Sequence, residues 1–156
     1  MKLSENFYLS EFEHSDYALR NDIDNTAPPA VVANLQRLCI DILQPLRGRI
    51  ERPIRITSGY RCRQLNGSIG GSPRSAHIAG LAADIQVPGM TPLEVAEALA
   101  EIRCDKIIQE FDGWVHVQVA PTGAEPRLAL YTACRAHGRT HYVPGLMPAD
   151  EAAARV

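Results

Sequence analysis

Two short segments in which apolar and polar residues alternate, residues 82–87 and 114–119, constrain the fold of this chain most. Alternate residues of a β-strand point to opposite faces of a sheet, so each segment predicts a strand with one face in the core. The other face then carries Asp84 in the first strand and His116 in the second. His77 precedes the first strand by a glycine-containing turn, which can fold it back toward Asp84.

Two imidazoles and one carboxylate are a ligand set that zinc uses in enzymes. Three protein ligands leave a fourth coordination position open to water, and zinc brings the pKa of such a water close to neutral. The pattern of His77, Asp84 and His116 therefore predicts a zinc hydrolase with one Zn²⁺ per chain. The alternative from spacing alone is three ordinary polar residues on an exposed sheet face.

Size and composition indicate one domain without nucleic-acid or membrane partners. The chain has 156 residues, of which 46% are hydrophobic and 22% charged, as in an ordinary globular domain. A net charge of -2 and the absence of Lys/Arg runs argue against nucleic-acid binding. No apolar run is long enough for a membrane span, and the N-terminus has no apolar signal core. We expect a monomer made in a cytoplasm without a signal peptide.

The cysteines are predicted to be free thiols. Cys39, Cys62, Cys104 and Cys134 form no C-x-x-C pair, and the N-terminus offers no secretory context for disulfides. We expect most of them to be buried. Cys62 is the exception of interest, because it lies beside the candidate site.

The remaining pattern predicts an α+β fold with a small, mainly antiparallel sheet and flanking helices. A single domain spans residues 1–156, with an N-terminal arm over 1–28 and a loosely ordered tail over 143–156. The other expected elements are a helix from Pro29 to about Gly48, a strand over 53–58, a glycine-rich loop over 61–76, a helix over 91–102, a hairpin of 106–111 with 114–119 across Asp112-Gly113, and a strand over 127–132.

Four separated motifs resemble one known family. Ser75-x-His77-x-x-Gly80-x-Ala82-x-Asp84 and Trp114-x-His116 are similar to motifs of the zinc D-alanyl-D-alanine carboxypeptidase-like peptidases. That family includes L-alanyl-D-glutamate endopeptidases and phage endolysins. Ser58-Gly59-Tyr60-Arg61 resembles its upstream element, and residues 3–12 look like the start of the bacteriophage branch. The resemblance covers residues 3 to about 145.

The resemblance implies a role for each matched residue. His77, Asp84 and His116 would bind zinc. Arg61 would steady the reacting carbonyl oxygen or a substrate carboxylate, to which its bidentate fork is suited; the alternative is a structural ion pair.

The resemblance also implies substrate-binding residues. Ser75 would bond to substrate or hold the His77 loop, unless it is a plain turn residue. Tyr60 and Trp114 would bind substrate, although Trp114 also suits a buried position in the sheet.

The general base is less clearly marked. Much of the family has an acidic residue three positions before the second histidine, where this chain has Gly113. The candidates are Glu110 and Asp112. In a regular two-residue hairpin, Asp112 shares the parity of His116 and Glu110 faces away. Glu110 is favoured if the loop is longer or bulged, as the Glu-Phe before Trp-x-His of the phage branch suggests.

The function that these features imply is a zinc metallopeptidase acting on peptidoglycan stem peptides. A phage endolysin or a virion-associated lysin, acting on the cell wall after release or as part of a virion, fits a chain without a signal peptide. The alternatives are a non-catalytic phage tail or baseplate protein that keeps the fold, and a hydrolase of free D-Ala-D-Ala.

Overall fold

A mixed six-stranded sheet organises the computed structural model, which describes residues 1–156. Its strand order is β3-β4-β6-β5-β7-β8, and a separate two-stranded sheet pairs β1 with β2. Only the β5–β7 pair is parallel; every other pair is antiparallel. The α+β fold class with a mainly antiparallel sheet is therefore confirmed. No helix is both long and apolar enough to cross a membrane.

The elements follow one another in this order: β1 (Lys2–Ser4), β2 (Phe7–Tyr8), α1 (Leu9–Glu13), α2 (Asp16–Arg20), α3 (Pro29–Leu38), η1 (Cys39–Leu43), α4 (Gln44–Ile50), β3 (Arg55–Ser58), α5 (Arg63–Ser68), β4 (Ala82–Gln86), α6 (Pro92–Leu99), β5 (Lys106–Glu110), β6 (Trp114–Gln118), β7 (Ala129–Ala136), β8 (Arg139–Pro144) and α7 (Ala149–Ala154).

The long helix predicted from Pro29 is a continuous run of α3, η1 and α4. Pro29 occupies its first turn, where a missing N–H costs nothing. The middle segment, Cys39–Leu43, has π-helical hydrogen bonding. The run ends at Ile50, where Glu51 takes a left-handed conformation with φ of 51°. Five apolar residues along it are fully buried: Leu35, Leu38, Ile42, Leu43 and Leu46.

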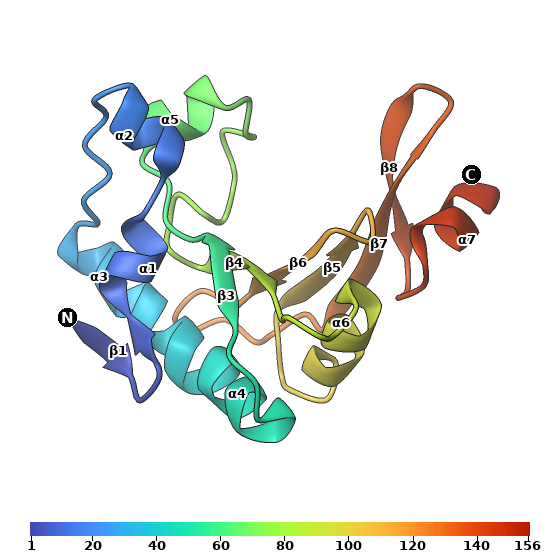
Figure 1. Ribbon diagram of the computed structural model, residues 1–156, viewed down its shortest axis with the longest axis horizontal. Coiled ribbons are helices and arrows are strands. Elements are labelled where there is room, and N and C mark those ends of the chain that lie inside the picture. The colour runs from blue at the N-terminus through green and yellow to red at the C-terminus, as the bar shows by residue number, and fades with distance from the viewer.

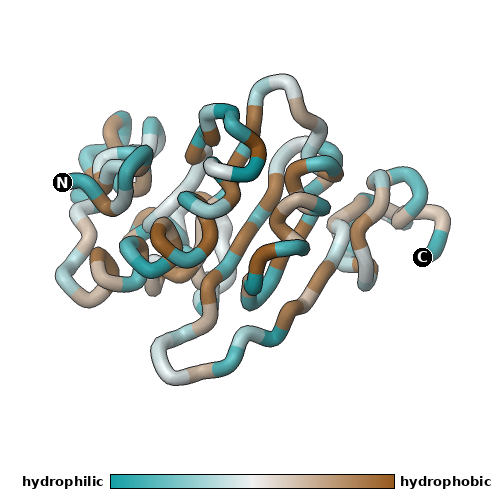
Figure 2. The backbone as a smooth tube through the Cα atoms, turned by 90° about the horizontal axis from the view of Figure 1, so that it is seen from below, coloured by the Kyte–Doolittle hydropathy of each residue, from teal (hydrophilic) through white to brown (hydrophobic).

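The core lies between this helical run, α6 and one face of the sheet. The odd-numbered residues of β4 and β6, such as Ile85 and Val117, are buried against the helices. In Figure 1, α4 and α6 lie along the same side of the strands. Brown, hydrophobic stretches run through the central strands and the neighbouring helices, while many connecting loops are teal or white (Figure 2). The even-numbered residues of the two strands are left for the opposite face.

The N-terminal arm is docked against this body. Leu3, Phe7 and Phe12 are at most 2% exposed and belong to the main core cluster. The Tyr60 backbone N–H donates to the Phe12 carbonyl at 2.8 Å, which fixes α1 beside the segment that follows β3.

The β5–β6 hairpin differs from the two-residue turn expected across Asp112-Gly113. The strands end at Glu110 and begin again at Trp114, so residues 111–113 form the loop. Phe111 and Asp112 both have positive φ, 59° and 56°. Glu110 therefore pairs directly with Trp114, and Ile108 pairs with His116. The longer loop reverses the expected parity and puts Glu110 on the face of His116.

The C-terminal part holds more regular structure than the sequence predicted. The strand expected over 127–132 runs as Ala129–Ala136, and β8 returns beside it after a turn in which His137 and Gly138 have positive φ. Where we expected a loosely ordered tail over 143–156, the chain completes β8 and forms α7. Ala152 of α7 is fully buried against a small cluster with Cys134 and Met147.

All four cysteines are free, as predicted, and Cys39, Cys104 and Cys134 are buried. Burial raises the pKa of the Cys39 and Cys104 thiols to about 12, so neither is a reactive thiolate. Cys62 is half-buried and caps α5, where its sulfur accepts from the Leu65 N–H at 3.4 Å.

Candidate active site

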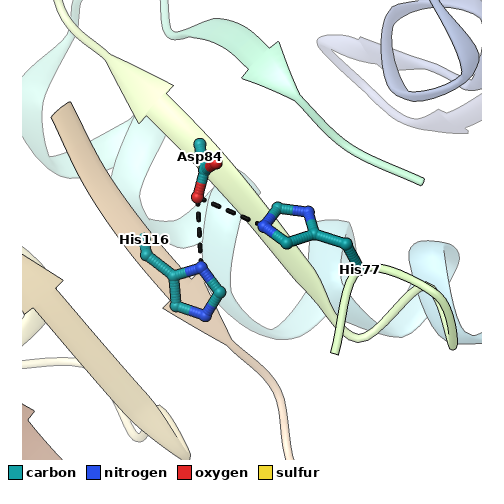
Figure 3. A group of neighbouring side chains, drawn as sticks. All are labelled: His77, Asp84 and His116. Atoms are coloured by element: carbon teal, nitrogen blue, oxygen red, sulfur yellow. Dashed lines mark hydrogen bonds and ion pairs between the residues drawn. The ribbon is translucent and has the colours of Figure 1, made fainter. Parts of the chain in front are cut away.

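Neighbouring strands and one turn bring His77, Asp84 and His116 together. β4 and β6 are antiparallel neighbours in which Asp84 lies directly opposite His116. His77 comes from the turn before β4 and points its ring at the same carboxylate (Figure 3). One ligand atom from each residue lies within 4.8 Å of the other two. The set of two imidazole nitrogens and one carboxylate oxygen fits a zinc ion.

A backbone carbonyl orients His77. The ring is 2% exposed, and its Nδ1 lies 2.7 Å from the Gly59 carbonyl oxygen. A carbonyl can only accept, so Nδ1 carries the proton. The unprotonated Nε2 then faces Asp84, with its closest oxygen at 3.3 Å. This is the tautomer that a metal ligand needs.

His116 is oriented through its other nitrogen. Its Nε2 lies 2.8 Å from Oε1 of Gln118, and its Nδ1 lies 3.1 Å from Oδ1 of Asp84. Gln118 accepts the Nε2 proton and leaves Nδ1 free for a metal. Gln118 also donates to the buried Asp105 at 3.5 Å, so the orientation of the ring is supported from the far side.

The electrostatics of the cluster favour a charged carboxylate. Burial opposes ionisation of Asp84, but the neighbouring His116 and His77 outweigh it and hold the pKa of Asp84 well below its ordinary value. Burial likewise opposes protonation of His116, but the Asp84 carboxylate raises the pKa of His116. A dense negative charge at this point is what a divalent cation requires.

Two glycines shape the backbone around His77. Gly80 has a φ of +72°, and a Cβ there would lie 2.7 Å from Cγ1 of Val31. A Cβ on Gly59 would lie 2.6 Å from the Phe12 Cα. Side chains at either position would push the His77 turn, or the carbonyl that orients it, away from the neighbouring helices.

Arg61 lies in the cleft beside the cluster. Its backbone N–H donates to the His77 carbonyl at 3.2 Å, and its Nη1 donates to the Asn66 Oδ1 at 3.2 Å. Asn66 is 2% exposed and also donates to the Ser72 carbonyl at 2.8 Å. No carboxylate lies within ion-pair distance of Arg61, and its buried Nε has no hydrogen-bond partner. The structural ion pair considered above is therefore absent.

The structure separates the two candidate bases. Glu110 lines the same cleft as the three ligands. Trp114 Nε1 donates to its Oε2 at 2.6 Å. Burial, and then the nearby charge of Asp84, raise the pKa of Glu110 above its ordinary value. Such a carboxyl is suited to exchanging a proton near neutral pH.

Asp112 does not line the cleft. Its Oδ1 accepts from the Gln109 side chain at 2.8 Å and from the Ala149 N–H at 2.9 Å. These bonds join the hairpin loop to the start of α7. Asp112 thus has a structural position, contrary to its expected candidacy as a base.

The expected substrate-binding residues are placed differently from one another. Ser75 lines the cleft and accepts from the His77 N–H at 3.2 Å, so it can hold the loop and face a ligand. Tyr60 is 8% exposed and packs in the core, which corrects its expected place at the site. Trp114 is half-buried beside the cleft and acts on Glu110 through the hydrogen bond above.

The cleft has a volume of about 460 Å³ and an open mouth. Several of its residues were not assigned to the site from sequence: Arg74, Lys106, Ile108, Gln118, Arg127, Ala129, Tyr131 and Tyr142. Period-two alternation with Glu110 could have found Lys106 and Ile108. Gln118 lies on the expected polar face of its strand. The residues from β7 and β8 carried no comparable signal.

Fold and cluster together give a possible metal site on the polar face of a sheet. A family profile described as Peptidase M15 matches residues 5–118, and the chain belongs to this family of zinc D-Ala-D-Ala carboxypeptidase-like peptidases. Membership supports a metallopeptidase that acts on peptidoglycan-like substrates. A comparison with curated proteins finds no significant match.

Proposed function

We propose that this protein is a zinc-dependent peptidase that hydrolyses peptide bonds in the stem peptides of peptidoglycan. The observation that carries the proposal is the convergence of His77, Asp84 and His116 within 4.8 Å in an open cleft. Both imidazoles have their other nitrogen held by an oxygen acceptor, so the site is preorganised for a metal.

The roles of the residues follow from their places. A bound zinc ion supplies a Lewis acid and an activated water at this position. Glu110 takes the proton of the attacking water and passes it to the leaving amine. Trp114 fixes the direction of the Glu110 carboxylate through its 2.6 Å hydrogen bond. Arg61 binds the developing oxyanion or a substrate carboxylate with its guanidinium.

The charge of the cleft supports an acidic substrate. Four basic side chains line it, Arg61, Arg74, Lys106 and Arg127, against two carboxylates, Asp84 and Glu110. Arg127 is paired with Asp105, but the other three exceed the two carboxylates, in a chain whose net charge is -2. Stem peptides carry several carboxylates, and a cleft of opposite sign attracts such molecules.

A role as a phage endolysin or virion-associated lysin that acts at the cell wall is part of this proposal. It rests on the resemblance of residues 3–12 to the phage branch. The non-catalytic alternative would gain support if the cleft held no general base, and Gly113 occupies the usual acidic position. Glu110 supplies a carboxylate to the cleft from a different position, so that reason for the alternative no longer holds.

Digestion of purified peptidoglycan tests the proposal. We expect zinc-loaded protein to release muropeptide fragments, and mass spectrometry of these fragments to give the scissile bond. Metal-free protein should be inactive until zinc is returned. Zinc-loaded protein that leaves both peptidoglycan and synthetic stem peptides intact would overturn the proposal.

A further inference from the structure

Lys106 lies in the cleft on the same sheet face as the ligands. β5 pairs Ile108 with His116 and Lys106 with Gln118. Lys106 therefore lies two residues along β5 from the position opposite His116. Two residues of strand and one strand spacing separate the Cα atoms of His116 and Lys106 by about 8 Å. That distance corresponds to two or three residues of an extended peptide.

The charge of Lys106 has no partner in the protein. No carboxylate lies within 4.0 Å of its ammonium group. The adjacent Asp105 is already engaged, because Arg127 donates to both of its oxygens at 2.7 to 3.2 Å. The residue is half-buried and lines the cleft, so its unpaired ammonium is available to an anion that enters the cleft.

The surroundings of Lys106 leave room for a ligand group. Its neighbour across β5–β7 is the small residue Ala129. Tyr131 lies opposite Ile108, and Tyr142 on β8 lies opposite Ala133. Both tyrosines line the cleft, and their hydroxyl groups can donate hydrogen bonds. These walls come from β7 and β8, which lie outside residues 5–118.

We infer that Lys106, flanked by Tyr131, forms a subsite for a carboxylate of the substrate. The subsite rests on the proposed function and extends it. Arg61 follows β3, on one side of the Asp84–His116 pair, and Lys106 is on β5, on the other side. The cleft therefore holds an acidic peptide at two points that flank the metal ligands. The ligand class is a peptide with a free carboxylate two or three residues from the scissile bond.

Binding to an inert background tests the subsite. Three synthetic stem peptides serve as probes: a parent with all carboxylates free, one with the glutamate α-carboxylate amidated, and one with a C-terminal amide. Calorimetry is carried out in a Glu110→Gln background, so that hydrolysis does not interfere. We expect this background to bind one of the two amides more weakly than the parent. Lys106→Met should weaken binding of the parent about 10-fold or more, the effect of one charge-assisted hydrogen bond.

Matched variants distinguish a specific subsite at Lys106 from a nonspecific effect of charge and from a folding defect. Lys106→Met should bind the discriminated amide as well as the Glu110→Gln background does, since that peptide lacks the group that Lys106 holds. Lys106→Arg should keep the discrimination. The only other lysine, Lys2, lies over the Tyr8 ring at 5.9 Å, and Lys2→Met should change nothing. Melting temperature and zinc content should match across the set.

Other outcomes are decisive. If Lys106→Met binds the parent normally, or loses the same factor for all three peptides, the subsite does not exist. Absence of parent-peptide binding to the Glu110→Gln background would also overturn it. Failure of the protein with Glu110 intact to cleave peptidoglycan would instead overturn the proposed function, because the binding measurements do not depend on cleavage.

Discussion

The inner and outer halves of the sheet contribute differently to the cleft. The inner strands β3, β4, β6 and β5 lie within residues 5–118 and carry or position the three candidate ligands, Arg61 and Glu110. The outer strands β7 and β8 lie beyond that range and supply walls, including Tyr131 and Tyr142. The difference indicates that the chemistry resides in the part shared with the family. In our proposal, the part that follows contributes walls that contact the substrate.

Hydrogen bonds join the two halves. Arg127, just before β7, binds Asp105, which in turn accepts from Gln118 beneath His116. Asp112 in the hairpin loop holds the first N–H of α7. The outer half is thus connected to the cluster of His77, Asp84 and His116. Variants in each half can therefore distinguish loss of the reaction from loss of structural support.

The largest effect is expected from loss of a candidate ligand in the inner half. His116→Ala should lose stoichiometric zinc and all detectable peptidase activity, because two ligands rarely retain zinc. Metal analysis and peptidoglycan digestion check this. His141→Ala is the control in the outer half, since this histidine bonds only to the Ala136 carbonyl. Undiminished zinc in His116→Ala would remove His116 from the metal site.

Replacement of the proposed general base, Glu110, should leave metal binding and the fold unchanged. Glu110→Gln should lower kcat by about 10²–10⁴-fold, the usual loss when a general base is removed. Zinc content and melting temperature should stay close to those of the unmodified protein. Asp112→Asn is the matched control, and it should retain turnover while loosening α7. A loss of turnover in Asp112→Asn with Glu110→Gln active would reverse our assignment of the base.

Arg61 should act on substrate without stabilising the fold. Lysine cannot reproduce the guanidinium fork, so Arg61→Lys should lower kcat/KM by about 10- to 100-fold. The melting temperature and zinc content should hardly change, because no carboxylate is paired with this side chain. A variant that unfolds or loses zinc would show that Arg61 is structural, and full activity would exclude it from the reaction.

The smallest expected effect concerns the link between the halves. Hydrogen bonds from Arg127 hold the pKa of Asp105 below its ordinary value. The carboxylate therefore stabilises the fold above the unfolded-state pKa of about 3.9, and this contribution is lost as the pH falls through the folded-state pKa. Asp105→Asn should reduce the free energy of unfolding by about 1–3 kcal/mol at neutral pH. Urea unfolding from pH 3 to 7 should show the difference shrinking below about pH 4. A pH-independent difference would contradict this origin.

Local periodicity predicted the inner half well. The alternation in 82–87 and 114–119 places Asp84 and His116 on one face, and the structure pairs them directly. The length of the hairpin loop was harder to predict from the sequence, because Phe111 adopts a left-handed conformation that aromatic residues rarely take. Since one added loop residue reverses the parity of a strand, this local detail decided which carboxylate reaches the cleft.

The outer half carried weaker signals. In β8 the side chains alternate between half-buried and exposed, with no fully buried residue, so its sequence lacks the apolar face that marks a strand. Helix α7 is rich in alanine and buries little beyond Ala152. Tyr60 was misplaced for a different reason. Its neighbour Arg61 does line the cleft. Similarity of a sequence motif does not show which of two adjacent side chains points into the cleft and which into the core.

The contact between Phe12 and Gly59 has a consequence for the boundaries of any transplantable catalytic module. Phe12 rests on Gly59, and the Gly59 carbonyl fixes the proton on His77. A fragment designed to begin at the first long helix would keep His77, Asp84 and His116 and yet lose the Phe12 contact that holds this carbonyl in place. For grafting or fusion, α1 therefore counts as support for the candidate metal site, and the smallest portable unit must include it.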